Sequence, residues 1–191
     1  MGATDEVGGT PVERSFFARD SVTVARALIG VGVYVDGVGG MIVETEAYDP
    51  GDPASHTFRG PTARNAAMFG PHGHAYVYRS YGLHWCMNFV CTAGSGVLIR
   101  AIVPLTGLEM MIARRGLAEP RLLCSGPGRL CQALGVDRSF DGLALDAPPF
   151  ALVEAAAAHD VASGPRIGIT RAVETPWRFG LRGSRFLSRA I

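Results

Sequence analysis

Two carboxylates and an aromatic ring stand at alternate positions in residues 41–48, MIVETEAY. This stretch is typical of a β-strand, in which successive side chains point to opposite faces. Glu44, Glu46 and Tyr48 therefore share one face, while the residues between them can enter a core. A carboxylate in this setting can act as a base on a water molecule. An ordinary half-buried strand with a solvated face has the same pattern, so the pattern alone leaves both interpretations open.

The close spacing of Glu44 and Glu46 makes them neighbours rather than opposed groups. Most glycosidases place two catalytic carboxylates on either side of the bond that breaks. We therefore expect one carboxylate to act singly, and Glu46 is favoured because it lies nearer the end of the strand and Tyr48. Arg100 is the only polar residue of the apolar stretch 97–103. A buried arginine needs an acidic partner whether its role is catalytic or structural, and Glu46 is a candidate for that partner.

Aromatic side chains and histidines surround the acidic strand in the sequence. The faces of Tyr48, His56 and Tyr78 could bind a planar ligand, such as a base taken out of a nucleic-acid stack, or simply pack a sheet. A second group of histidines has a spacing that occurs in metal sites and, by chance, in His-Gly loops: His72, His74 and His84. No carboxylate is close to them in the sequence, so we expect surface histidines and no metal site.

Composition limits the class of protein. The chain has 191 residues, 48% of them hydrophobic, which suits one domain with a substantial core. It has no run of about 18 apolar residues and no apolar signal core near its start, so we predict a cytoplasmic protein, nucleoid-associated in a bacterium, that makes no membrane contact. The spacing of its four cysteines fits neither a zinc knuckle nor a redox pair, so we predict reduced and mostly buried thiols.

All 18 basic residues are arginines, which excludes a lysine Schiff base, a lysine nucleophile and a P-loop lysine. Charges are also grouped along the chain. Residues 1–52 hold nine acids and three arginines, whereas residues 53–138 hold nine arginines and three acids. Residues 139–165 hold four acids and no arginine, and residues 166–191 hold six arginines and one acid. The two basic segments could face a polyanion, or they could belong to a mixed surface that these boundaries divide arbitrarily.

The elements that must position these residues can be predicted from local patterns. Residues 1–14 are predicted to form a disordered tail and residues 15–191 a single domain. Helices are expected where a capping residue or proline precedes, and a glycine follows, an apolar stretch: 20–29, 108–115 and 125–134. Strands are expected in the β-branched and aromatic stretches 31–35, 41–48, 97–103 and 178–182, and on both sides of a turn at 80–83 within residues 75–91. Residues 150–153 could form a loop or a short strand, and residues 166–169 could form another short strand.

Between these elements lies an irregular segment, residues 49–74, whose length is typical of a functional loop. Residues 75–91 follow it and are predicted to form a β-hairpin with Tyr81 at its tip beside Gly82. A large aromatic side chain at such a tip is exposed unless it is inserted into something. The pattern as a whole predicts a mixed α+β (α/β) fold: a mainly antiparallel, curved sheet with flanking helices and a protruding β-hairpin.

Six motifs occur in a fixed order: IVETEAY at 42–48, ASH at 54–56, MFGP with YVYRSYG and CMN within 68–88, VLIRA at 97–101, CSGPGRLCQAL at 124–134 and LRGS at 181–184. Together they resemble the alkyladenine (3-methyladenine) DNA glycosylase family over nearly the whole chain. The resemblance implies a monofunctional DNA glycosylase of base excision repair, which needs no cofactor. It implies that alkylated purines, such as 3-methyladenine and 7-methylguanine with hypoxanthine as a further candidate, are flipped out of duplex DNA and their N-glycosidic bond is hydrolysed.

The resemblance also implies roles by position. Tyr81 would be the wedge that enters the minor groove and replaces the extruded nucleotide. Glu46 would activate the attacking water, and Arg100 and the backbone carbonyl of Ile169 would help to hold it.

In the base pocket that the resemblance implies, Tyr48, His56 and Tyr78 would enclose the base. Asn88 would obstruct the exocyclic amine of guanine. The arginine-rich segments then have a partner in the phosphates of double-stranded DNA, with backbone contacts expected from three arginines: Arg64, Arg79 and Arg182. We expect a monomer.

The chemistry agrees with these assignments. A purine alkylated at N3 or N7 is cationic and already a good leaving group, so one carboxylate can suffice. An aromatic cage suits such a cation. Without lysine, a lyase reaction through a lysine imine is excluded. Arg79 and Ser80 precede the wedge where the family commonly has apolar residues, which leaves the range of neutral lesions open.

The hairpin carries a geometric condition. A two-residue loop would place Tyr78 and Asn88 on opposite faces, so a three-residue loop or a bulge is predicted. Two other functions remain open. A hydrolase of free nucleosides or small glycosides would need the carboxylate but not the wedge, and a DNA-damage binding module would need neither base release nor Glu46.

Overall fold

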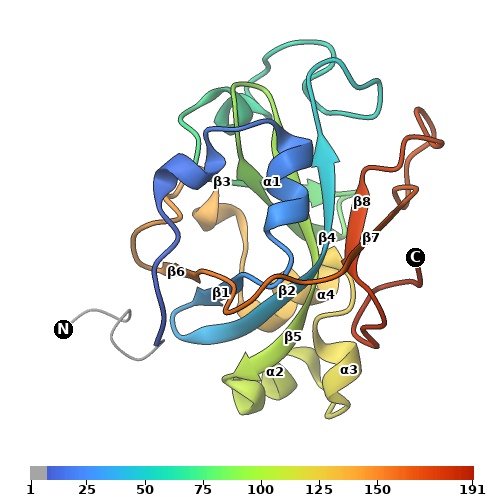
Figure 1. The fold of residues 1–191 in the computed structure, drawn as a ribbon. Coiled ribbons are helices and arrows are strands. Elements are labelled where there is room, and N and C mark those ends of the chain that lie inside the picture. Colours follow the sequence, from blue (N-terminus) through green and yellow to red (C-terminus); the bar gives the residue numbers. More distant parts are fainter. Residues whose placement is uncertain (1–7) are drawn as a thin grey trace.

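The strand that carries Glu44 and Glu46 lies inside an antiparallel sheet (Figure 1). In the computed structural model, which describes residues 8–191, β2 (Val38–Tyr48) pairs along one side with β5 (Gly96–Thr106). Along its other side β2 pairs first with β1 (Gly32–Val35) and then with β8 (Arg178–Leu181). Strand β2 therefore has one neighbour that precedes it directly, β1, and two from distant parts of the chain, β5 and β8.

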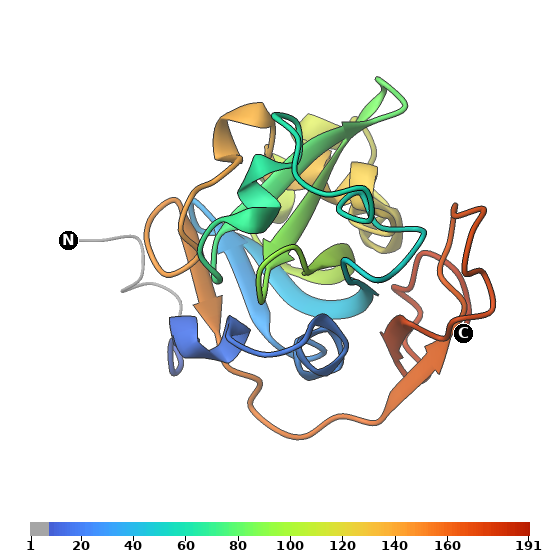
Figure 2. The ribbon, with the colours of Figure 1, turned by 90° about the horizontal axis from the view of Figure 1, so that it is seen from above.

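The other strands extend this sheet at both ends, in the order β3-β4-β5-β2-β1-β6, with β7 joined to β8: β3 (Ala75–Ser80), β4 (His84–Val90), β6 (Phe150–Val153) and β7 (Val161–Gly164). All pairings are antiparallel among the described residues. The sheet curls, as Figure 2 shows from above. The predicted class, a mixed α+β domain with a curved antiparallel sheet, is confirmed.

Short helices accompany the sheet: α1 (Ser21–Ala27), α2 (Leu108–Arg115), α3 (Pro120–Leu123) and α4 (Pro127–Leu134), with single 3-10 turns η1 (Arg14–Phe17), η2 (Ala66–Phe69) and η3 (Arg138–Phe140). The three predicted helices are confirmed as α1, α2 and α4, while the four-residue α3 was not predicted. Asp20 caps α1 by accepting a hydrogen bond from the Thr23 N–H. Thr45 donates its hydroxyl to the Ala25 carbonyl at 2.8 Å, so β2 turns its non-acidic face toward α1.

The hairpin of β3 and β4 projects beyond the rest of the fold (Figure 2). Ser80 pairs with His84, which leaves a three-residue loop, and Tyr76 pairs with Asn88. The predicted three-residue loop is therefore confirmed. Because paired residues share a face of the hairpin, Asn88 lies on the same side as Tyr76 and Tyr78.

Two predictions about local structure were wrong. The strand expected at 166–169 is displaced to β7, and residues 165–176 form a loop. The reason is that a backbone group of this loop bonds to a side chain and not to a neighbouring strand: the Ile167 N–H donates to Glu46. The other is the disordered tail predicted over residues 1–14, because its residues 11 and 12 pack on the fold. Val12 is buried, and its N–H donates to the carbonyl of Leu152 in β6. The first part of that tail, residues 1–7, lies outside the described residues.

The four cysteines are free and buried, as predicted. His84 is exposed, whereas His72 and His74 are partly exposed. Within residues 8–191, no group of three or more histidine, cysteine, aspartate or glutamate side chains is arranged to hold a metal ion. Over the same part of the chain, no helix is long and apolar enough to cross a membrane.

Candidate active site

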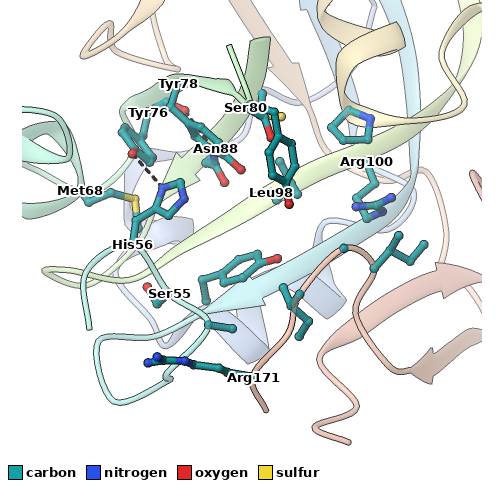
Figure 3. A pocket seen from close by; sticks show the side chains of 18 of the residues that line it. Ser55, His56, Met68, Tyr76, Tyr78, Ser80, Asn88, Leu98, Arg100 and Arg171 are labelled. Atoms are coloured by element: carbon teal, nitrogen blue, oxygen red, sulfur yellow. Dashed lines mark hydrogen bonds between the residues drawn. The ribbon is translucent and has the colours of Figure 1, made fainter. Parts of the chain in front are cut away.

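A cavity of about 480 Å³ opens between the end of β2, the hairpin and the two loops 49–74 and 165–176 (Figure 3). Eight of the residues singled out in the sequence line it: Tyr48, His56, Arg64, Tyr78, Tyr81, Asn88, Arg100 and Ile169. Figure 3 shows His56, Tyr78 and Asn88 grouped toward one side of the cavity, with Arg100 toward the other. The fold thus brings most of the sequence candidates to one place.

Three sequence candidates lie elsewhere. Glu46 has no exposed surface and lies behind the cavity wall rather than in it. Arg79 is exposed, with its guanidinium over the ring of Trp85 at 5.7 Å. Arg182 is exposed and pairs with Asp160 at 2.8 Å, away from the cavity lining.

The Glu46 carboxylate accepts two hydrogen bonds and forms one ion pair. The Tyr48 hydroxyl donates to Oε2 at 2.9 Å, and the Ile167 N–H donates to Oε1 at 2.7 Å. Arg100 Nη1 lies 3.4 Å from Oε1. Burial, followed by the charge of Glu46, raises the pKa of Tyr48 far above its usual range, so its phenol keeps the proton that it donates. A carboxylate has about four lone-pair sites, which leaves room for one more donor, such as a water molecule.

Arg100 joins the two glutamates of β2. Its Nε donates to Glu44 Oε1 at 3.1 Å, while its Nη1 faces Glu46. Burial disfavours the charged guanidinium, but Glu46 and then Glu44 outweigh it, and the pKa of Arg100 is raised. Because Arg100 also lines the cavity, it is the cation nearest to Glu46 that a bound molecule could meet.

The aromatic side of the cavity is tied together by side-chain contacts. His56 Nδ1 and the Tyr76 hydroxyl form a hydrogen bond of 3.1 Å, and the rings of His56 and Tyr78 meet edge to face with centroids 4.4 Å apart. Burial and then the charge of Arg64 lower the pKa of His56, so its ring is neutral at neutral pH. The Asn65 amide donates to the His56 carbonyl at 2.9 Å, which fixes this part of the long loop.

Asn88 is held by the hairpin itself. Its Nδ2 donates to the Tyr76 carbonyl at 3.1 Å, so its carbonyl oxygen is the group left for the cavity. Cys86 also lines the cavity, and burial raises the pKa of its thiol to about 11. The thiol is therefore protonated at neutral pH and is a weak nucleophile.

Tyr48 is supported from behind by residues that the sequence did not reveal. The Arg166 guanidinium lies 4.8 Å from the centroid of the Tyr48 ring and 5.4 Å from that of Trp177. Its Nη2 donates to Asp52 Oδ1 at 3.0 Å, and its Nη1 contacts Asp52 Oδ2 and the Ala47 carbonyl. Arg166 does not line the cavity, so it covers the ring face that is turned away from it.

Other groups were missed for different reasons. Asp52, Arg166 and Ile167 carry no local pattern, because their partners are more than 100 residues away in the chain. Tyr76 had a signal: it shares its hairpin face with Tyr78 and could have been grouped with it by alternation.

The tip of the hairpin combines exposure with an uncommon backbone. Tyr81 is 86% exposed and has a φ of 50°, a left-handed conformation that costs a non-glycine residue about 1–2 kcal/mol. Leu83 beside it is 71% exposed. An exposed aromatic residue with a strained backbone, at the mouth of a cavity, indicates that its side chain contacts another molecule.

Comparison with known proteins identifies relatives of this chain by sequence. The sequence model of the family described as "Methylpurine-DNA glycosylase (MPG)" matches residues 15–185. A relative from Nitrosospira multiformis, named "Putative 3-methyladenine DNA glycosylase", is 61% identical over 176 residues, which cover 91% of each chain. Relatives of the same name from Agrobacterium fabrum and Rhizobium meliloti are 61% and 63% identical, covering 93% and 91% of this chain and 92% and 94% of theirs.

The buried pair behind Tyr48 gives a stability prediction. Arg166→Met should leave the Asp52 carboxylate buried without its cation and lower the free energy of unfolding by about 3–5 kcal/mol. Asp52→Asn in the same chain should recover part of this loss, as urea unfolding would measure. Arg182→Met, which breaks an exposed pair, is the matched control and should change stability little. Additive losses for the two buried substitutions would contradict a coupled pair.

The lowered pKa of His56 gives a pH prediction. Below its ordinary value of 6.5, an unfolded histidine binds a proton that the folded ring refuses, so the unfolded state is favoured as pH falls. The contribution of His56 to stability should therefore be complete above about pH 6.5 and decline below it. Thermal unfolding of the wild type and His56→Gln between pH 5 and pH 8 measures this as a difference that changes with pH. A difference that is constant over this range would contradict the prediction.

Proposed function

The chain belongs to the methylpurine-DNA glycosylase family, and from this premise we propose that it removes alkylated purines from duplex DNA with a water molecule activated by Glu46. As a DNA glycosylase it hydrolyses an N-glycosyl bond. The observation that carries the proposal is the position of Glu46 directly behind Tyr48 and Arg100, which line a cavity with aromatic sides.

The proposed reaction uses the free lone-pair site of Glu46. A water beside Glu46 and Arg100 would attack C1′ of the flipped nucleotide, and Glu46 would accept the proton that the water loses. The bond from C1′ to the purine nitrogen breaks, and its electron pair moves to the base and neutralises the positive charge there. Glu46 would also stabilise the cationic character of the sugar in the transition state. The Tyr48 hydroxyl and the Ile167 N–H hold the carboxylate in position for both tasks.

The proposed base pocket suits a cationic purine. Tyr48 and Tyr78 offer ring faces, and the lowered pKa of His56 leaves its own ring uncharged beside the base. None of the residues lining the cavity is an aspartate or a glutamate that could protonate a neutral purine. We therefore propose that 3-methyladenine and 7-methylguanine are released much faster than hypoxanthine, which lacks the positive charge.

Tyr81 is proposed to fill the gap that the flipped nucleotide leaves. Its exposure and its place at the tip of a projecting hairpin support this role. Arg64 and Arg79 lie on the same side of the molecule: Arg64 lines the cavity and donates to the Arg79 carbonyl at 3.0 Å. Both are proposed to contact DNA phosphates near the cavity, whereas Arg182 is a more remote candidate because Asp160 already pairs with it.

The role of Glu46 is tested by Glu46→Gln. Base release from a duplex with one alkylated adenine should slow by about 10²–10⁴, because the general base is lost while the shape is kept. Binding of the same duplex, measured by fluorescence anisotropy, should persist. Glu109→Gln, an exposed carboxylate in α2, is the control and should release base at the wild-type rate. Equal rates for the wild type and Glu46→Gln would refute the mechanism, and no release by the wild type would favour a damage-binding module.

The role of Tyr81 is tested by Tyr81→Gly, which removes the ring and suits the left-handed backbone. The melting temperature should stay equal or rise, since glycine adopts a φ of 50° without strain. Base release from duplex DNA should nevertheless fall about tenfold or more, because flipping costs a few kcal/mol that the wedge offsets. Release from single-stranded DNA should change little. Activity on free nucleosides that is unchanged by Tyr81→Gly would instead support the alternative function, a nucleoside hydrolase.

A further inference from the structure

The carboxyl-terminal segment, residues 184–191, reaches back to the two glutamates of β2. The Ser188 hydroxyl donates to Glu44 Oε1 at 2.8 Å, and the Ser188 N–H donates to Glu44 Oε2. Glu44 is wholly buried and also accepts from Arg100 and from Arg178 Nη1 at 3.0 Å. Four donors therefore meet on one buried carboxylate, and two of them belong to Ser188.

This segment is anchored independently of Ser188. Arg178 donates to the carbonyls of Arg189 at 3.1 Å and Ala190 at 2.8 Å. Ile191 packs so closely on the β7–β8 pair that a Cβ added at Gly180 would lie 2.5 Å from its Cδ1. Figure 1 shows the end of the chain beside β7 and β8. The segment is thus built into the fold, and Ser188 is held at a defined place.

Ser188 also contacts the cavity arginine directly. Arg100 Nη2 donates to the Ser188 hydroxyl oxygen at 3.2 Å, while that hydroxyl donates to Glu44. Glu44 accepts a hydrogen bond from Nε of the same guanidinium. Two nitrogens of Arg100, Nε and Nη2, are therefore bound on the side away from Glu46. A guanidinium is a rigid plane, and fixing two nitrogens fixes the third. The third is Nη1, which faces Glu46.

We infer that Ser188 is a positioning residue for base release, acting through Arg100, and that Glu44 is its partner in this task. The inference rests on the proposed function. Ser188 and Glu44 do not line the cavity, so neither is placed to touch a base bound in it. They orient the arginine that lines the cavity and faces Glu46, so their effect should appear in the rate of the chemical step and not in the affinity for DNA.

The test compares Ser188→Thr with Ser188→Val, which have the same shape and differ by one hydroxyl group. Under single-turnover conditions, Ser188→Val should release alkylated adenine about tenfold more slowly than Ser188→Thr, since a misplaced group near the chemistry commonly costs this much or more. The dissociation constant for the duplex should agree between the two variants within about twofold. Ser184→Ala is the control, because Ser184 lies in the same segment and accepts only from the Phe186 N–H.

Coupling to Arg100 separates positioning from mere stabilisation. In an Arg100→Gln background, replacing Thr by Val at position 188 should make no further difference, because the group that Ser188 orients is absent. Equal rates for the two position-188 variants, or losses that add to that of Arg100→Gln, would overturn the inference. Base release by the wild type is measured first, and its absence would refute the proposed function itself. If the wild type releases base and the two position-188 variants have equal rates, only the role of Ser188 is refuted.

Discussion

Two neighbouring carboxylates cannot both be buried on one strand unless cations accompany them, and this constraint governs the centre of the protein. Glu44 and Glu46 have no exposed surface, and Arg100 lies between them from the adjacent strand β5. Arg178 from β8, on the opposite side of β2, supplies the second cation for Glu44. The pairing of β2 with both β5 and β8 is therefore an electrostatic requirement as well as a matter of hydrogen bonding.

The same constraint explains part of the grouping of acidic and basic residues along the sequence. The acidic first segment contributes Glu44, Glu46 and Asp52, and arginines from the two basic segments neutralise them inside the fold. Part of the apparent polyanion-facing charge is thus internal. What remains for a nucleic acid is the exposed set around the cavity mouth and hairpin, which includes Arg64 and Arg79.

Local patterns could predict much of this architecture, because alternation and capping act over a few residues. Strand β2, the hairpin and its three-residue loop followed from such patterns. Arg166 and Ser188 could not be found in this way, since their partners Asp52 and Glu44 are 114 and 144 residues away. Their positions depend on β8 closing onto β2, a tertiary event that periodicity does not encode. The error of the strand expected at 166–169 has the same cause. Glu46 accepts a hydrogen bond from the Ile167 N–H, which would otherwise be free to pair with a neighbouring strand.

The burial of the four thiols has a chemical consequence for an enzyme of alkylation repair. A cell that contains alkylated purines also contains the electrophiles that produced them, and these attack amines and thiolates of proteins. This chain has no lysine, and burial raises the pKa of Cys86 to about 11 and of Cys91 and Cys124 to about 12. Burial also raises the pKa of Cys131 well above its ordinary value. Buried thiols with raised pKa values are mostly protonated at neutral pH, so the fold makes them poor targets for such reagents.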